Sequence, residues 1–69
     1  AQFANRIIDG ESPLRVYRDY RGLTQSALAE RASVNRVQIA DIEAGRKSGS
    51  IETVKKLANA LGVAVDDLI

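Results

Sequence analysis

Two short helical patterns with a brief break between them constrain this chain more than any other feature. Thr24 is predicted to cap a helical pattern that ends near Ala32, and a second pattern begins after Asn35 and ends at Gly45. A helix of about nine residues is marginal in isolation. Two short helices in place of one long helix are useful only if the angle between them matters. The sequence therefore predicts a tight corner at residues 33–35.

Capping signals predict further helices on both sides of this corner. The Ser-Pro pair at residues 12–13 is a side-chain cap followed by a first-turn proline, and this helix ends at Gly22. Ser50 caps a longer helix that Gly62 ends, and a final turn covers residues 65–69. No segment has the alternating pattern of a strand, so we expect an all-α fold.

Four residues are expected to shape the corner itself. Asn35 is predicted to cap the second short helix, with Gln38 as its reciprocal capping-box partner. Val34 in the turn and Leu23 before the first helix are apolar, and we expect both to pack inward. Their packing would hold the angle between the two helices.

The N-terminal residues carry a weaker helical pattern, in which the apolar positions are Phe3, Ala4, Ile7 and Ile8. We assign residues 1–13 to an accessory segment with one short helix and residues 14–69 to a single domain. A chain of 69 residues buries only about 60% of the surface that its unfolded form exposes, which leaves too little core for two domains. The first residue is Ala1 rather than Met, as in a trimmed chain or a piece of a longer protein.

Composition argues against several function classes. The chain has no Cys and no His, which excludes thiol nucleophiles and zinc sites built from these residues. No carboxylate pair or glycine-rich phosphate loop stands out, so we expect neither an enzyme nor a cofactor. No apolar run approaches the roughly 18 residues of a membrane span, and no secretory signal is present, which predicts a cytoplasmic protein without a membrane partner. The net charge of +1 is too small to indicate a polyanionic partner.

One side of the second short helix has small side chains and few charges, which is unusual for a surface that only needs to be soluble. A helical projection at about 100° per residue places Ile39 and Ile42 on one side. The opposite side carries Arg36, Val37, Ala40, Asp41 and Ala44. Small side chains let a helix approach another surface closely, and the major groove of DNA admits one helix with little room to spare. This side is therefore suited to entering a groove.

Three segments resemble the Cro and phage-repressor (Xre) type helix-turn-helix family, over roughly residues 14–69: LRVYRDYRGLTQSALAERASV, IADIEAGR and SIETVKKLANALGV. The resemblance implies a compact five-helix repressor-like DNA-binding domain, here with an additional short N-terminal helix. It also implies binding of double-stranded operator DNA as a two-fold homodimer, with residues 35–44 as the recognition helix.

The resemblance implies contacts for individual residues. Arg36 would bond the O6 and N7 atoms of guanine, and Val37 would touch a thymine methyl group. Asp41 would accept from a cytosine amino group, although phosphates repel a carboxylate that lacks a donor, so a surface role is the alternative. The residues expected to contact phosphates are Gln25, Asn35, Gln38, Arg46 and Lys47.

The resemblance also includes one structural pair and three departures. Arg18 and Glu43 match a position pair that the family uses as an internal ion bridge between the first helix and the recognition helix. Ser33 stands where a turn glycine is common, Ala44 replaces a polar residue, and Gly49 stands where proline is common. These departures predict a slightly altered turn and a looser loop before the last long helix.

Two function classes are consistent with these sequence features. The first is a sequence-specific DNA-binding transcriptional regulator, a repressor, whose affinity would fall steeply with salt. The alternative is a protein-interaction module, such as the antitoxin of a toxin–antitoxin pair, which would bind its partner through the N-terminal segment. Apolar C-terminal residues predict a homodimer that sets two recognition helices about 34 Å apart: Val63, Val65, Leu68 and Ile69.

Overall fold

A computed structural model describes residues 11–69 of the chain. This part contains four α-helices, one 3-10 helix and no strand: α2 (Pro13–Tyr20), α3 (Gln25–Ala32), α4 (Arg36–Glu43), α5 (Ile51–Leu61) and η1 (Val65–Asp67). The predicted all-α class is confirmed. The short helix predicted for the N-terminal segment lies outside the described residues.

The five-helix count predicted for the domain is wrong for the part of the chain that the structure describes. After α5, the chain forms only the three-residue 3-10 helix η1. Its backbone bonds run from Asp67 N–H to the Ala64 carbonyl at 3.0 Å and from Leu68 N–H to the Val65 carbonyl at 2.9 Å. Both are bonds between residues three apart, and this tighter winding is used in short pieces.

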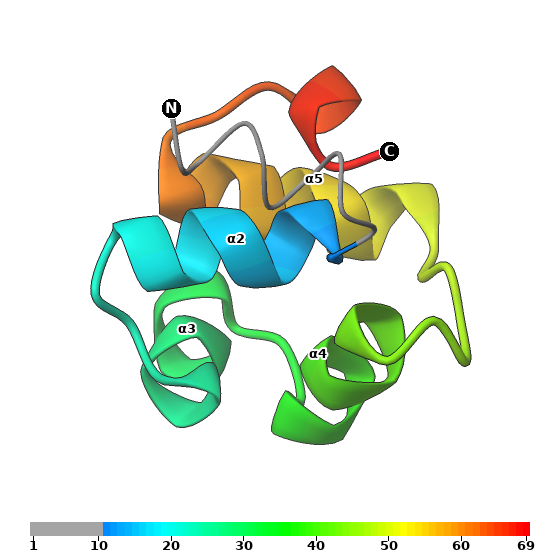
Figure 1. Cartoon of the computed structure of the whole chain (residues 1–69), viewed down its shortest axis with the longest axis horizontal. Helices are drawn as coiled ribbons and strands as arrows, with labels where there is room; N and C mark the ends of the chain where they lie inside the picture. The colour runs from blue at the N-terminus through cyan, green and yellow to red at the C-terminus, as the bar shows by residue number, and fades with distance from the viewer. Residues whose placement is uncertain (1–10) are drawn as a thin grey trace.

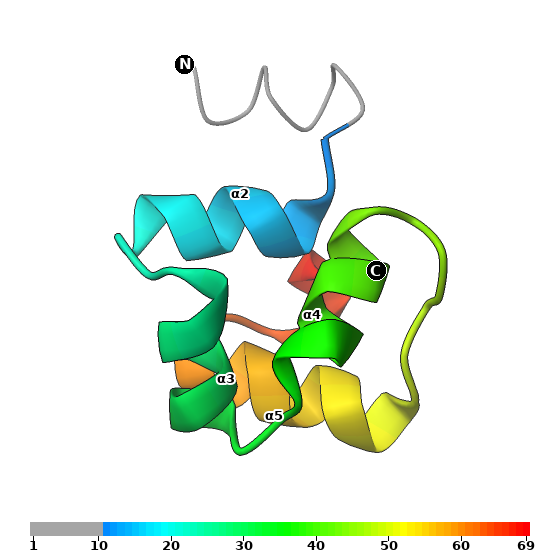
Figure 2. The ribbon, with the colours of Figure 1, turned by 90° about the horizontal axis from the view of Figure 1, so that it is seen from below.

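The helices form two sides of one small body. Figure 1 shows α2 in front of α5, with α3 and α4 on one side of the molecule and η1 on the opposite side. Figure 2, seen from below, shows α3 and α4 joined by the short turn. α3 contacts both α4 and α5, and α4 also contacts α2. The corner between α3 and α4 is therefore held by α5, which contacts α3, and by α2, which contacts α4.

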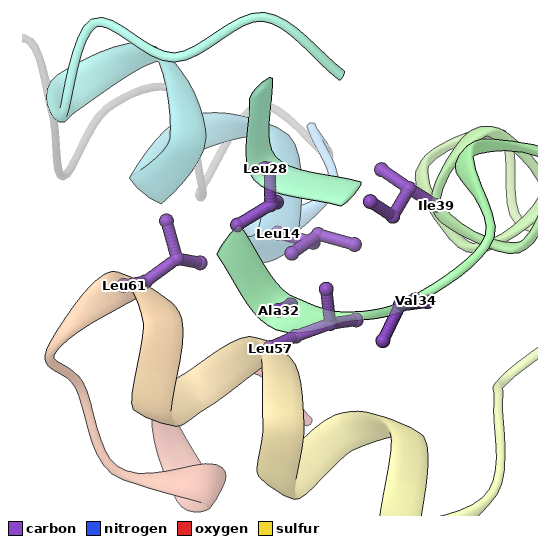
Figure 3. Close-up of a cluster of buried hydrophobic side chains, with 7 residues drawn as sticks. All are labelled: Leu14, Leu28, Ala32, Val34, Ile39, Leu57 and Leu61. Atoms are coloured by element: carbon purple, nitrogen blue, oxygen red, sulfur yellow. The ribbon is translucent and has the colours of Figure 1, made fainter. Parts of the chain in front are cut away.

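A cluster of apolar side chains joins all four helices and the corner (Figure 3). Its buried members are Leu14, Leu28, Ala32, Val34, Ile39, Leu57 and Leu61. Leu23 and Ile42 are partly buried and pack against this cluster. Full burial of one large aliphatic side chain contributes about 1.5–3 kcal/mol. The inward packing predicted for Val34 and Leu23 is confirmed, and the core fixes the angle between α3 and α4.

Two of the predicted helix caps are confirmed. The Thr24 hydroxyl accepts a hydrogen bond from the Ala27 N–H group at 3.0 Å, and the Ser50 hydroxyl accepts from the Thr53 N–H group at 3.1 Å. Each hydroxyl satisfies one of the unpaired donors at a helix start.

The predicted Asn35 cap is also confirmed, whereas the Ser12 cap and the capping box with Gln38 are wrong. Ser12 makes no side-chain cap bond at the start of α2, where Pro13 already removes one unpaired donor. Asn35 does cap α4, but its side chain accepts from the Val37 N–H group at 2.7 Å. The Gln38 N–H group instead donates to the backbone carbonyl of Asn35 at 3.0 Å, so the predicted capping box with Gln38 is not formed.

The turn between α3 and α4 places Ser33 in the left-handed region, with φ 55° and ψ 44°. Ser33 is the only residue other than glycine with a positive φ between residues 11 and 69. The left-handed conformation costs an L-residue roughly 1–2 kcal/mol, and glycine adopts it without that cost. Residue 33 therefore has the left-handed backbone conformation that glycine adopts most easily, although it is a serine.

Replacement of Ser33 by glycine is expected to stabilise the domain by about 0.5–1 kcal/mol, because the strain is relieved at a smaller cost in unfolded-chain entropy. Urea unfolding followed by circular dichroism measures the change. The matched control is Ser26→Gly, an exposed serine in the first turn of α3, which should destabilise by at most about 0.5 kcal/mol. A lower midpoint for Ser33→Gly would show that the turn is not strained.

The structure explains why glycine, and not the proline common in the family, stands at position 49. The φ of Gly49 is +77°, and a Cβ atom placed there would lie 2.8 Å from Ile42 Cδ1. Proline is locked near φ −65°, so it is incompatible with this loop. The loop before α5 thus follows a path that the more common proline would not allow.

Candidate nucleic-acid interface

The first turn of α4 presents its side chains to solvent. Arg36, Val37 and Gln38 are exposed, and Val37 is one of four large apolar residues between residues 11 and 69 with more than half of their surface accessible, at 56%. Ile39 on the other side of the helix is fully buried, at 0%. Because the turn begins at the Asn35 cap, this exposed end lies directly after the corner. The projected division of α4 into a core side and an outer side is confirmed at these positions.

The last turn of α4 is tied to α2 by an ion pair. Arg18 Nε donates to Glu43 Oε2 at 2.7 Å and Arg18 Nη2 donates to Glu43 Oε1 at 3.0 Å. The two side chains are only 12% and 6% exposed. The hydrogen bond to Glu43 raises the pKa of Arg18 above its ordinary value, while burial opposes this effect. The expected pair is thus present in bidentate form, which is the strong geometry for such pairs.

Arg18 holds the approach to α3 as well. Its Nη1 group donates to the backbone carbonyl of Leu23 at 2.8 Å. One guanidinium therefore connects α2, the segment before α3, and the end of α4. The polar contacts of Arg18 therefore restrain the corner between α3 and α4 in addition to the packing of the apolar core.

Gln25, at the start of α3, bridges the two ends of α4. Its Nε2 group donates to Glu43 Oε1 at 3.2 Å, and its Oε1 atom accepts from Arg36 Nη1 at 3.3 Å. A glutamine amide has two N–H groups, so one remains for an outside acceptor. The sequence predicted Gln25 as a phosphate contact but did not predict this bridge. The only sequence feature that could have indicated the bridge is the presence of polar residues in the first turns of both helices.

Arg36 keeps most of its hydrogen-bonding capacity in this arrangement. A guanidinium carries five N–H donors, and the structure uses one of them, at 3.3 Å to Gln25. The side chain is exposed. Arg36 can therefore be oriented by Gln25 while it still offers a planar fork to a base edge.

Asp41 occupies a different environment from the first-turn residues. Its Oδ1 atom accepts from Arg46 Nε at 2.8 Å, and its Oδ2 atom lies 3.9 Å from Lys47 Nζ. The Asp41 side chain is 16% exposed, whereas those of Arg46 and Lys47 are 63% and 74% exposed. The structure thus brings three predicted DNA contacts together as one ion cluster, which the sequence did not indicate.

The remaining predicted contacts lie near α4. Asn35 is exposed and its Oδ1 atom is used by the helix cap. Gln38 lines a small hollow together with Ile42, Lys47 and Gly49. These positions place polar groups on both the start of α4 and the loop that follows it.

Two classes of site do not occur in the part of the chain that the structure describes. Between residues 11 and 69, no three carboxylates gather as they would to hold a metal ion. No helix in that range has the length and apolar character needed to cross a membrane.

A family model described as helix-turn-helix matches residues 14–68. The chain belongs to the Cro/Xre-type helix-turn-helix family. The resemblance predicted from the sequence is confirmed.

Relatives in this family include phage and bacterial proteins. The chain is 39% identical over 56 residues to the immunity repressor protein of Bacillus phage phi105, which covers 81% of this chain and 39% of that protein. It is 30% identical over 64 residues to control protein C.BamHI of Bacillus amyloliquefaciens, covering 93% of this chain and 79% of that protein. The chain spans 39% and 43% of the length of two curated relatives that it matches.

A solved structure has the same helix-turn-helix fold. The restriction-modification controller protein C.AhdI from Aeromonas hydrophila superimposes with a TM-score of 0.79 and 31% sequence identity. The match covers 84% of this chain and 88% of that chain.

Proposed function

We propose that this helix-turn-helix chain is a sequence-specific DNA-binding transcriptional regulator, a repressor that reads operator DNA in the major groove with α4. The observation that carries the proposal is the exposed first turn of α4, which presents Arg36 and Val37 and where Gln25 of α3 orients Arg36. An arginine fork suits guanine and an exposed valine suits a thymine methyl group. The names of the relatives, an immunity repressor and control proteins, support the same function.

Phosphate contacts would come from both sides of this turn. The start of α3 offers free backbone N–H groups and the remaining Gln25 amide hydrogen, and helix starts favour anions. Asn35 and Gln38 flank Arg36, and Arg46 and Lys47 follow the end of α4. Such contacts set the position of a protein on DNA, while base contacts supply sequence preference.

A homodimer is part of the proposal. Ile51 and Ile69 are 63% and 78% exposed, whereas Val63 and Leu68 pack against the core. The start of α5 and the C-terminus lie toward the same end of the long axis in both views (Figures 1 and 2). A two-fold contact at that end would leave the α3–α4 sides of both copies facing the same way, as binding to two half-sites requires.

The protein-interaction alternative rests on the apolar residues of the N-terminal segment, which lie outside the described residues. No contact between residues 11 and 69 favours an antitoxin role, and the family match favours the regulator.

Selection of bound duplexes from a random pool tests the proposed function. We expect a two-fold symmetric consensus with half-sites about 34 Å apart, roughly one helical turn. On the selected duplex, log K should fall linearly with log salt, by about 0.9 for each phosphate contacted. A pool without enrichment would contradict the proposal. Enrichment of a single unpaired half-site, with sedimentation showing only monomer on DNA, would remove the dimer and leave the regulator.

A further inference from the structure

The end of α4 is closed by an ion cluster whose members were expected from the sequence to have separate roles. The chain reverses after α4 through Gly45, whose φ is +77°. The backbone N–H groups of Arg46 and Lys47 then donate to the Asp41 carbonyl at 2.9 Å and 3.4 Å. The side chains of both cations turn to the Asp41 carboxylate, at 2.8 Å and 3.9 Å. Asp41 therefore holds this short segment through its backbone and its side chain at once.

The carboxylate is poorly placed to read a base in this state. It is 16% exposed and already accepts a hydrogen bond from Arg46. A carboxylate contacts cytosine by accepting from the amino group, which would require Asp41 to release at least one partner. The two cations, by contrast, are largely exposed, so they are available to an outside anion without that loss.

We infer that Asp41 is a positioning residue that restrains Arg46 and Lys47 beside the recognition helix and partly neutralises them; the inference rests on the proposed function. The local formal charge is +1 with Asp41 and would be +2 without it. A phosphate that binds the exposed N–H groups of Arg46 is attracted less strongly, because the nearby carboxylate partly offsets the charge of the guanidinium. Binding to arbitrary DNA, which depends almost wholly on phosphate contacts, is thereby weakened. Operator binding is weakened less. The base contacts from the first turn of α4 fix the position of the protein on the operator, and in that position the restrained Arg46 and Lys47 lie close to phosphates.

Asp41→Asn tests this role because asparagine keeps an oxygen acceptor for Arg46 and removes the charge. We expect the affinity for a random-sequence duplex to rise by about three- to ten-fold at moderate salt, with a steeper dependence on salt. The ratio of operator to random affinity should fall. Base preference at every operator position should remain that of the wild-type chain, which a base-reading role for Asp41 would not allow.

Asp66→Asn is the matched control. Asp66 is exposed in η1, on the side of the molecule opposite α4 (Figure 1), and its replacement removes the same charge. We expect a change of less than about two-fold on either duplex, because at physiological salt exposed charges interact weakly beyond about 8 Å. An equal effect of both variants would mean that net charge, and not the cluster, is responsible.

A double-variant cycle separates restraint from direct contact. In an Arg46→Ala background, Asp41→Asn should change random-duplex affinity by clearly less than in the wild-type chain, since its main partner is absent. The inference is overturned if Asp41→Asn leaves random-duplex affinity unchanged or alters preference at one base pair. If the wild-type chain selects no sequence at all, the proposed function fails first, and the inference fails with it.

Discussion

Replacement of Glu43 by alanine is expected to destabilise the domain by about 3–5 kcal/mol, because it leaves the buried Arg18 guanidinium without its bidentate partner. Arg18 then keeps only the half-exposed Asp19 carboxylate, at 3.4 Å, and the Leu23 carbonyl. The side chains of Arg18 and Glu43 are shielded from water, at 12% and 6% exposure, so solvent compensates the lost interaction only slightly. Gln25 loses its acceptor at the same time. A single core in a chain of this size rarely supplies more than about 3–5 kcal/mol. The variant should therefore be largely unfolded, which loss of the helical circular dichroism signal would show.

The double variant Arg18→Met with Glu43→Leu is the control for this prediction. It removes both charges and keeps apolar volume, and buried pairs replaced in this way often lose little or no stability. We expect its urea midpoint to recover most of the loss. If Glu43→Ala alone costs less than about 1 kcal/mol, the pair behaves like an exposed surface bridge, and the α2–α4 connection depends on the apolar core instead.

Replacement of Arg36 by alanine is expected to weaken operator binding by about 1–3 kcal/mol, equivalent to roughly 5- to 150-fold, and to relax preference at one base pair. The reason is the loss of a guanidinium that Gln25 orients at the start of α4. Titration of the selected duplex and of its single-base variants measures both effects. Affinity for random DNA should change much less.

Arg36→Lys separates base reading from charge. Lysine keeps the positive charge but lacks the planar fork that meets guanine with two hydrogen bonds. We expect near-wild-type affinity for random DNA and a reduced preference at the same base pair. Equal losses on operator and random duplexes for Arg36→Ala would indicate a phosphate contact, and α4 would then have to read bases through other residues.

Helix positions were predictable because their signals are local. Thr24 and Ser50 cap the helices they were expected to cap, since an N-cap depends only on the few residues that follow it. Val34 and Leu23 pack inward as expected, because apolar residues beside a tight corner have one sheltered direction. The Ser12 cap and the Gln38 capping box were wrong, since more than one hydrogen-bond arrangement satisfies the same helix start.

The candidate site was less predictable because its contacts join residues from different helices. The Arg18–Glu43 pair was expected only from family resemblance, as its members are 25 residues apart. The bridge from Gln25 to both Glu43 and Arg36 depends on how closely α3 approaches α4. Asp41 was expected to face bases, but the reversal of the chain at Gly45 brings Arg46 onto its carboxylate.

The sequence by itself determined the all-α class and the corner at residues 33–35, because helical periodicity and caps are encoded within a few neighbouring residues. The family followed from the resemblance of three sequence segments. Only the tertiary structure decided which polar groups meet around α4. Hydrogen bonds and ion pairs require partners within about 3–4 Å, and such distances between α2, α3 and α4 are set by how the shared core of Leu14, Leu28 and Ile39 packs.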